Sequence, residues 1–272
     1  MSQRRKLLSL LVCVVMVLSL TLVGCGGDGG RTSEEMRNVT PGVLTVGSDC
    51  DYPPFVEMQG DNAIGFEPEL LQAIAEEIGL DVEYLPPQNF DTILASVASG
   101  TKMDIGVSSF TINDERKKLV DFSIAYFDSN QAVVALNSSN YKTAMDFDGL
   151  VVGAQSGTTG AEWVKENLTS SGTTLKEFNA ASELMASLAA GDIQGAFFDE
   201  PAAAQYVATS YKNAHVVEVI PTGEQYGIAV SKDNPGLLQA INDAMKTIKK
   251  NGTFDKIFLK YFPDLTPPSL SA

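Results

Sequence analysis

The chain has 272 residues, 44% of them hydrophobic, and carries a formal net charge of −15. This composition excludes a disordered or fibrous protein, because such a chain can bury one large core or two small ones. The negative charge disfavours binding to nucleic acid phosphates. His215 and the single cysteine that remains in the folded part, Cys50, supply too few ligands for a zinc site. We therefore expect no metal, no cofactor and no nucleic acid partner.

The N-terminal segment, residues 1–24, is predicted to be a secretory signal. Basic residues at 4–6 precede an uncharged, mostly apolar run at 7–23, which is the order of charges in a signal peptide. The run is barely long enough to span a bilayer, so an uncleaved anchor is the alternative. It ends at Leu22-Val-Gly-Cys25, which resembles the lipobox of bacterial lipoproteins. We therefore expect lipid on Cys25.

Cleavage before Cys25 would leave a more acidic protein without an internal disulfide. It removes three basic residues and no acidic one, so the net charge falls from −15 to −18. This charge favours solubility outside the cell, or else an acidic field that attracts cations. Cys13 leaves with the signal, so Cys50 is the only cysteine of the folded part and is expected to be a small buried hydrophobe. Residues 25–40 have the composition of a flexible tether.

From residue 41 onward, short β-branched runs alternate with helical patterns, which is typical of parallel sheets covered by helices. Strands are expected at 43–46, 82–85, 105–107, 132–136, 151–154, 196–198 and 216–220. Helices are expected at 68–78, 90–98, 159–168, 182–190, 201–208, 235–249 and 253–261. In such folds ligands bind beyond the carboxyl ends of the strands, so the loops that follow the strands are the candidate site.

Four loop segments together resemble the bacterial extracellular solute-binding proteins of family 3, the polar amino-acid receptors of ABC transporters. The segments are Gly47-Ser-Asp-Cys-Asp-Tyr-Pro-Pro-Phe55 with Gly65-Phe-Glu67, Ser108-Ser-Phe-Thr-Ile-Asn-Asp-Glu-Arg116 with Asp121-Phe-Ser123, Gln155-Ser-Gly-Thr-Thr159, and Gly191-Asp-Ile-Gln-Gly-Ala-Phe-Phe-Asp199. Their order and spacing over residues 41–263 carry the resemblance more than any single segment does.

The resemblance assigns the ligand's α-carboxylate to Arg116, Thr111 and Thr159, with Thr158 beside them. A guanidinium matches a carboxylate with two parallel hydrogen bonds. Without the resemblance, Arg116 would read as a solvated surface arginine, and Thr158 and Thr159 as plain helix caps. Capping and anion binding use the same geometry, so the two interpretations of the threonines are compatible.

The remaining assignments concern the α-ammonium and the side chain of the ligand. Asp199, which could also be an N-cap, and the carbonyl of Ser109 would accept from the α-ammonium, since a buried cation needs such partners. Tyr52 and Phe90 would enclose the ligand side chain, and Asp49 would meet its polar or cationic tip. The acidic residue favours a basic or polar amino acid, although an amide such as glutamine also fits.

The resemblance implies an α/β fold of two lobes, each a mostly parallel sheet flanked by helices, with two hinge crossings. Lobe 1 would comprise residues 41–127 and 226–263, lobe 2 residues 128–225, and a tail residues 264–272. The predicted protein is a monomeric, lipid-anchored receptor outside the cytoplasmic membrane that closes on an amino acid and delivers it to permease subunits.

Two rival functions stay open: an extracellular dehydratase of the same fold acting on a cyclic amino or keto acid, and a ligand-sensing surface lipoprotein. No catalytic residue is predicted, because His215 lies outside the matched loops and no nucleophile is paired with a base.

Overall fold

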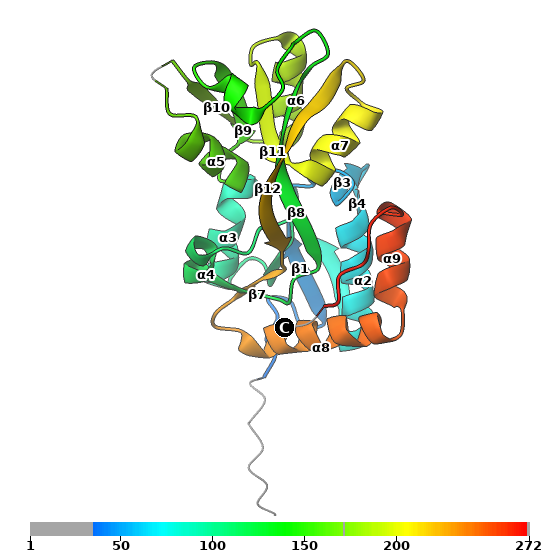
Figure 1. Cartoon of the computed structure of the whole chain (residues 1–272). Coiled ribbons are helices and arrows are strands. Elements are labelled where there is room, and N and C mark those ends of the chain that lie inside the picture. The colour runs from blue at the N-terminus through cyan, green and yellow to red at the C-terminus, as the bar shows by residue number, and fades with distance from the viewer. Residues whose placement is uncertain (1–34, 171, 271–272) are drawn as a thin grey trace, which may run out of the picture. The chain divides into compact units, whose positions relative to one another are not determined.

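The computed structural model describes residues 35–170 and 172–270, so the predicted signal, Cys25 and most of the tether lie outside the described residues. The described part is an α/β structure with two five-stranded sheets and one three-stranded sheet. Helices flank the two larger sheets (Figure 1). This is the two-lobed architecture that the sequence predicts.

The first sheet has the strand order β5-β1-β6-β13-β7. Its strands are β5 (Asp81–Tyr84), β1 (Val43–Gly47), β6 (Ile105–Gly106), β13 (Ala229–Ser231) and β7 (Val120–Phe122). The helices that lie between or after these strands in the sequence are α2 (Phe66–Ile78), α3 (Phe90–Ser99), α4 (Asp114–Leu119), α8 (Pro235–Lys250) and α9 (Thr253–Tyr261). Helix α2 begins at Phe66 rather than at the predicted Pro68. A proline in the first turn is tolerated, because its missing N–H would have no partner within the helix.

The second sheet has the order β10-β9-β11-β8-β12. Its strands are β10 (Thr174–Phe178), β9 (Val151–Gln155), β11 (Gly195–Asp199), β8 (Phe127–Leu136) and β12 (Ala214–Tyr226). A 3-10 helix, η1 (Ala144–Phe147), and helices α5 (Thr159–Asn167), α6 (Ala181–Ala190) and α7 (Glu200–Thr209) lie along the same part of the chain.

Both sheets are mostly parallel, as predicted, and each contains one reversed strand, β13 in the first sheet and β8 in the second. Strand β1 pairs in parallel with β5 and β6, and β9 pairs in parallel with β10 and β11, but the pairings of β13 with β6 and β7, and of β8 with β11 and β12, are antiparallel. The antiparallel strands are those next to the points where the chain passes between the sheets. It leaves the first sheet after β7, enters the second as β8, and returns through β12 to β13 (Figure 1).

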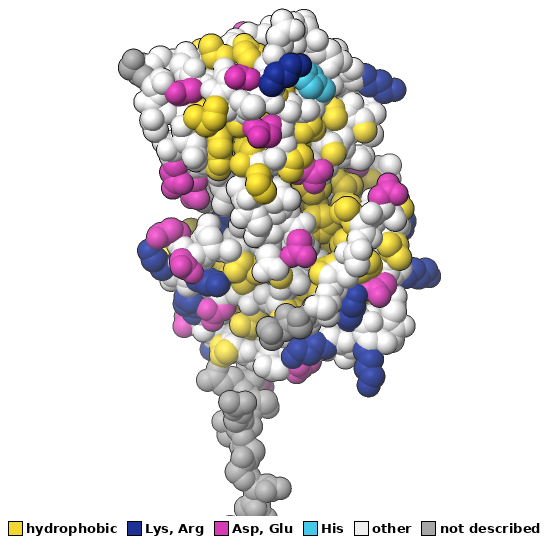
Figure 2. Space-filling model, in the orientation of Figure 1, with side chains coloured by type: hydrophobic (Ala, Val, Ile, Leu, Met, Phe, Trp, Pro, Cys, Tyr) yellow, Lys and Arg dark blue, Asp and Glu magenta, His cyan; other side chains and the backbone are white. Residues whose placement is uncertain are grey.

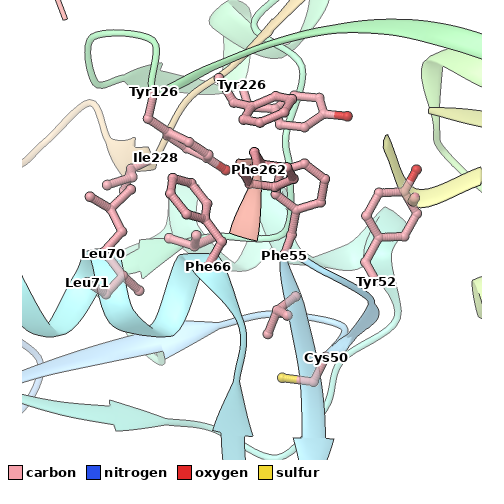
Figure 3. Close-up of a cluster of buried hydrophobic side chains, with 14 of the residues drawn as sticks. Cys50, Tyr52, Phe55, Phe66, Leu70, Leu71, Tyr126, Tyr226, Ile228 and Phe262 are labelled. Atoms are coloured by element: carbon pink, nitrogen blue, oxygen red, sulfur yellow. The ribbon is translucent and has the colours of Figure 1, made fainter. Parts of the chain in front are cut away.

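An aromatic cluster packs around the start of β8 and the end of β12, where the chain passes between the two sheets. Phe127 at the start of β8 stacks on Tyr226 at the end of β12, with 5.6 Å between the ring centroids. Phe55, Phe66 and Phe262 pack around this pair and are buried (Figure 3). Burial of one such ring contributes about 1.5–3 kcal/mol. Phe55 and Phe66, which the motifs of the first loop contain, therefore belong to the core.

A small hairpin sheet orders the loop that follows β1. It consists of β2 (Asp51–Tyr52), β3 (Val56–Gln59) and β4 (Asn62–Ile64). Gly65 closes it at a φ of 127°, where an added Cβ would lie 2.3 Å from the carbonyl oxygen of Phe55. Only glycine fits there, and this tight junction sets the path of the chain from Tyr52 into α2.

Candidate functional site

The structure brings every residue that the sequence predicts for the site to one cavity. The lining comprises Asp49, Tyr52, Phe90, Ser109, Thr111, Arg116, Thr158, Thr159 and Asp199, together with Ser108 and Gln155, which were not predicted as site residues. The residues follow strands of both large sheets, at the carboxyl ends where α/β folds hold ligands. The cavity has a volume of about 10 Å³, which is close to the room that one water molecule needs. An amino acid is larger, so some side chains must move to admit one.

Arg116 is a buried cation of the cavity, not a solvated surface residue. Only 8% of it is exposed, and its guanidinium carbon lies 5.5 Å from the ring centroid of Phe90 and 5.6 Å from that of Phe110. Nη1 donates to the carbonyl of Thr111 at 2.8 Å, and Nη2 donates to that of Gly157 at 3.1 Å. Burial lowers the pKa of Arg116 from its usual value, although the negative charges of nearby acids act to raise it. The guanidinium is thus held in place from the loops of both sheets.

Asp199 occupies the N-cap position of α7, but its side chain makes no capping hydrogen bond. The carboxylate instead accepts from the hydroxyl of Tyr226 at 2.5 Å and from Nε2 of Gln131. Its backbone N–H donates to the hydroxyl of Tyr52 at 3.1 Å. Burial and the negative charge of Glu224 raise the pKa of Asp199 to about 7. This is the environment of an acid that would gain from a nearby cation.

The two threonines of α5 have different tasks. The hydroxyl of Thr158 accepts from the N–H of Ala161 at 3.2 Å and is therefore the helix cap. The hydroxyl of Thr159 is not used for capping and donates to Oε2 of Glu224 at 2.8 Å. The hydroxyl of Thr111 donates to the same oxygen at 2.6 Å. Both hydroxyls that the family resemblance assigns to a ligand carboxylate therefore already bind a carboxylate of the chain.

Glu224 and Gln131 connect these groups and were not predicted from the sequence. Nε2 of Gln131 lies within hydrogen-bonding distance of Asp199, Glu224 and Thr159. Glu224 lies on a polar stretch of β12, where the sequence shows no strand pattern. Gln131 directly precedes the apolar run of β8 and is 1% exposed. In the sequence, the one available signal was a polar residue directly before an apolar run.

Asp49 lies at the cavity wall with both carboxylate oxygens engaged. Ser108 Oγ donates to Oδ1 at 2.6 Å, and Gln155 Nε2 donates to Oδ2 at 3.0 Å. Burial raises the pKa of Asp49 despite these hydrogen bonds. The neighbouring Asp51 does not line the cavity, and its carboxylate accepts from the N–H of Ser182 at 2.8 Å. Of the two aspartates of this loop, only Asp49 is therefore placed to meet a bound side chain.

The two aromatic residues predicted for the site both line the cavity, each supported by a second ring. Tyr52 stacks on Phe55 with 6.4 Å between the ring centroids, and Phe90 stacks on Phe110 at 4.6 Å. Offset stacking of this kind orients aromatic rings. The supporting rings fix the two walls of the cavity against which an apolar stem could lie.

Ser109 is held in an unusual backbone conformation by a buried acid. Its φ is 51°, in the left-handed region, and its N–H and hydroxyl donate to Oε1 of Glu67 at 2.7 and 3.0 Å. Glu67 is completely buried, also accepts from the hydroxyl of Tyr126 at 2.5 Å, and has its pKa raised by burial to about 7. Glu67 ends the segment Gly65-Phe-Glu67, whose sequence pattern gave it no role of its own. Its hydrogen bonds now identify it as the support of Ser109.

Cys50 and the remaining polar groups add no further chemistry to this cavity. Cys50 is buried, as expected, and burial raises the pKa of its thiol to about 11. Within residues 35–170 and 172–270, no group of histidine, cysteine and acidic side chains could hold a metal ion. His215 contacts Asn137 and does not line the cavity. Over the same ranges, no helix is long and apolar enough to cross a membrane.

The fold is that of the two-lobed periplasmic-binding proteins. The chain belongs to the bacterial extracellular solute-binding proteins, family 3, whose model matches residues 44–264.

Its relatives include amino-acid-binding proteins. The L-cystine-binding protein TcyJ of Escherichia coli (strain K12) is 32% identical over 262 residues, which are 95% of each chain. An ancestral arginine-binding protein solved with arginine is 37% identical, with a TM-score of 0.78 over 84% of this chain and 100% of that one. The ancestral amino acid-binding protein AncCDT-1, described as a precursor of cyclohexadienyl dehydratase, is 34% identical, with a TM-score of 0.74 over 81% and 96% of the two chains.

Proposed function

We propose that the protein is the extracytoplasmic substrate-binding receptor of an amino-acid ABC transporter and binds a polar or basic L-amino acid. The observation that carries this proposal is one cavity in which a buried guanidinium, Arg116, and a buried carboxylate, Asp199, come from loops of different sheets. A zwitterion presents the two complementary charges. Hydrogen bonds to charged groups contribute about 1.5–3 kcal/mol each, so these two ends supply most of the recognition energy.

In this proposal each residue predicted for the site has a role at one part of the amino acid. Arg116, Thr111 and Thr159 donate to the α-carboxylate, with the N-terminus of α5, capped by Thr158, beside them. Asp199 and the carbonyl of Ser109 accept from the α-ammonium. A separate set meets the ligand side chain: Tyr52 and Phe90 along its stem and Asp49 at its tip.

The proposed mechanism is closure of two lobes over the ligand. The lobes are residues 41–127 with 226–263, and residues 128–225, joined by the β7–β8 and β12–β13 passages. A ligand that touches both lobes favours the closed state through the contacts that exist only there. The closed monomer would then dock on the permease subunits, held at the outer face of the membrane by lipid on Cys25.

A dehydratase is the second candidate, and the similarity to a precursor of such an enzyme is the observation that favours it. An acid such as Asp49 or Glu57 would have to protonate a leaving group. Of these two acids, Asp49 lines the cavity and Glu57 does not. Both carboxylate oxygens of Asp49 already accept hydrogen bonds, from Ser108 and Gln155. A time course by mass spectrometry on every amino acid that binds decides between the two, since a receptor leaves its ligand unchanged.

The receptor proposal is tested by a thermal-shift screen of the domain without Cys25, after removal of co-purified ligand. The panel is the twenty amino acids with ornithine, citrulline and cystine. A ligand at 100 times its Kd adds about 2.7 kcal/mol of stability. Shifts confined to Arg, Lys, His or ornithine would support a cationic tip at Asp49, and shifts confined to Gln or cystine would keep the receptor but remove that assignment. Absence of any shift would contradict the proposal.

Replacement of Arg116 by alanine tests the proposed carboxylate clamp directly. We expect Arg116→Ala to weaken binding by about 2–5 kcal/mol, because the ligand carboxylate would lose its buried charged partner. The control is Lys117→Ala, which removes the same charge from the exposed side of α4. Isothermal titration calorimetry should show the loss only for Arg116→Ala. Equal affinity of the two variants would remove Arg116 from the site.

A further inference from the structure

The carboxylate of Glu224 has the partners that the proposed function assigns to a ligand. Its Oε2 accepts from the hydroxyl of Thr111 at 2.6 Å and from that of Thr159 at 2.8 Å, and its Oε1 lies 3.0 Å from Nε2 of Gln131. Thr111 belongs to the loop before α4 and Thr159 to the first turn of α5. One side chain therefore joins loops of both sheets through two threonines that line the same cavity.

The two carboxylates exclude each other at these hydroxyls. A hydroxyl has one proton to donate, so neither threonine can donate to Glu224 and to a ligand carboxylate at the same time. Two carboxylates brought to one pair of donors also repel each other strongly, as paired carboxylates do at shared sites. A ligand carboxylate can therefore reach Thr111 and Thr159 only after the Glu224 side chain has left them.

The backbone around Glu224 allows such a movement. Glu224 lies on β12, the outermost strand of its sheet, and the pairing of β12 with β8 shifts register between Ile220 and Glu224. The intervening residues 221–223 are exposed, and Gly223 has a φ of 65°. Bulges on edge strands commonly redirect side chains beside functional sites. The side chain of Glu224 is half-buried, so solvent is within its reach.

We propose that Glu224 is an internal latch that closes the two lobes when no amino acid is bound and competes with the ligand's α-carboxylate for Thr111 and Thr159. The proposal rests on the receptor function above. It predicts that the latch reduces affinity, because every binding event first breaks these two hydrogen bonds. It also makes a free carboxylate the feature that a ligand must have to displace Glu224.

The test is the affinity of Glu224→Ala for L-arginine, L-glutamine and L-cystine by isothermal titration calorimetry. The control is Glu218→Ala, which removes the same charge from the same strand but lies next to Ala144 N, away from the cavity. We expect the Kd of an amino acid that binds the wild-type protein to fall about tenfold in Glu224→Ala and to stay unchanged in Glu218→Ala. An unchanged Kd in Glu224→Ala would overturn the latch. A higher Kd would overturn it too, since it would make Glu224 a ligand contact.

A second readout separates the failure of the latch from the failure of the receptor. If none of the three amino acids binds the wild-type protein, the receptor proposal is the one in doubt. Small-angle X-ray scattering without any amino acid then decides on the latch: the radius of gyration should rise in Glu224→Ala, and an equal radius would overturn the proposal. If Glu224→Ala does not fold by circular dichroism, Glu224→Gln replaces it, with an expected fall in Kd of about threefold.

Discussion

Glu67 and Asp199 are two buried acids at or near the same cavity, and their surroundings differ. Glu67 accepts only from neutral groups, the N–H and hydroxyl of Ser109 and the hydroxyl of Tyr126. Asp199 lines the cavity and lies within the field of Glu224. Burial raises the pKa of both acids to about 7. A raised pKa alone therefore does not distinguish a structural acid from a binding acid.

The two acids differ in what surrounds the parts of each carboxylate that neutral donors leave unpaired. Among the residues that the structure describes, Oε2 of Glu67 has no hydrogen-bond partner although it is buried, and the same holds for the hydroxyl of Tyr84. Asp199 has a second carboxylate beside it, so a cation would relieve both burial and repulsion. We infer that Glu67 serves the backbone conformation of Ser109 in either protonation state, whereas Asp199 acts as a charge.

The largest expected effect is the loss of binding in Asp199→Asn. The amide keeps the size of the side chain and still accepts from Tyr226, but it removes the charge that would pair with the α-ammonium. Titration calorimetry at pH 8 should show a loss of about 2–5 kcal/mol. The matched control is Asp192→Asn, an exposed residue just before β11, which should bind as the wild-type protein does. Unaltered binding by Asp199→Asn would place the ammonium elsewhere.

A smaller effect is expected on stability when Glu67 is replaced by glutamine. The folded pKa of Glu67 is raised to about 7 from 4.5, so its stabilising contribution is complete below pH 4.5 and is lost as the pH rises through 7. Because of this carboxyl, the free energy of unfolding should be about 2 kcal/mol higher at pH 5 than at pH 8.

Urea denaturation of wild-type protein, Glu67→Gln and the control Glu77→Gln at pH 5 and pH 8 measures this contribution. Glu77 is exposed on the same helix as Glu67. Asp199 contributes with the same sign in all three proteins, so the difference between them isolates Glu67. The same pH dependence in all three would contradict the assignment.

The smallest expected effect is the pH dependence of affinity. As the pH falls from 8 to 6, Asp199 takes up a proton through its pKa of about 7 and loses the charge that pairs with the α-ammonium. The Kd of the amino acid found in the screen should rise about tenfold. Glu67→Gln should keep this profile and Asp199→Asn should flatten it. The opposite pattern would exchange the roles of the two acids.

Much of the site was predictable because its residues follow strands in recognisable motifs. Arg116, Asp199, Thr158 and Thr159 could be assigned to the site because they lie in segments that resemble the family in sequence and in order. On the face shown in Figure 2, acidic side chains are scattered rather than gathered in one patch, so the overall charge was no guide to the site. Gln131 and Glu224 carry no motif, and their importance arises from strand pairing across the chain.

The sequence by itself determined the α/β class, the order of the main strands and helices, and the family to which the chain belongs. Those features depend on local periodicity and on short segments, which a single chain displays directly. Only the tertiary structure decided which strand of each sheet is reversed, that Glu67 supports Ser109, and that Glu224 contacts Thr111 and Thr159. These contacts join residues far apart in the chain, and burial and pairing between such residues have no signature in the local sequence.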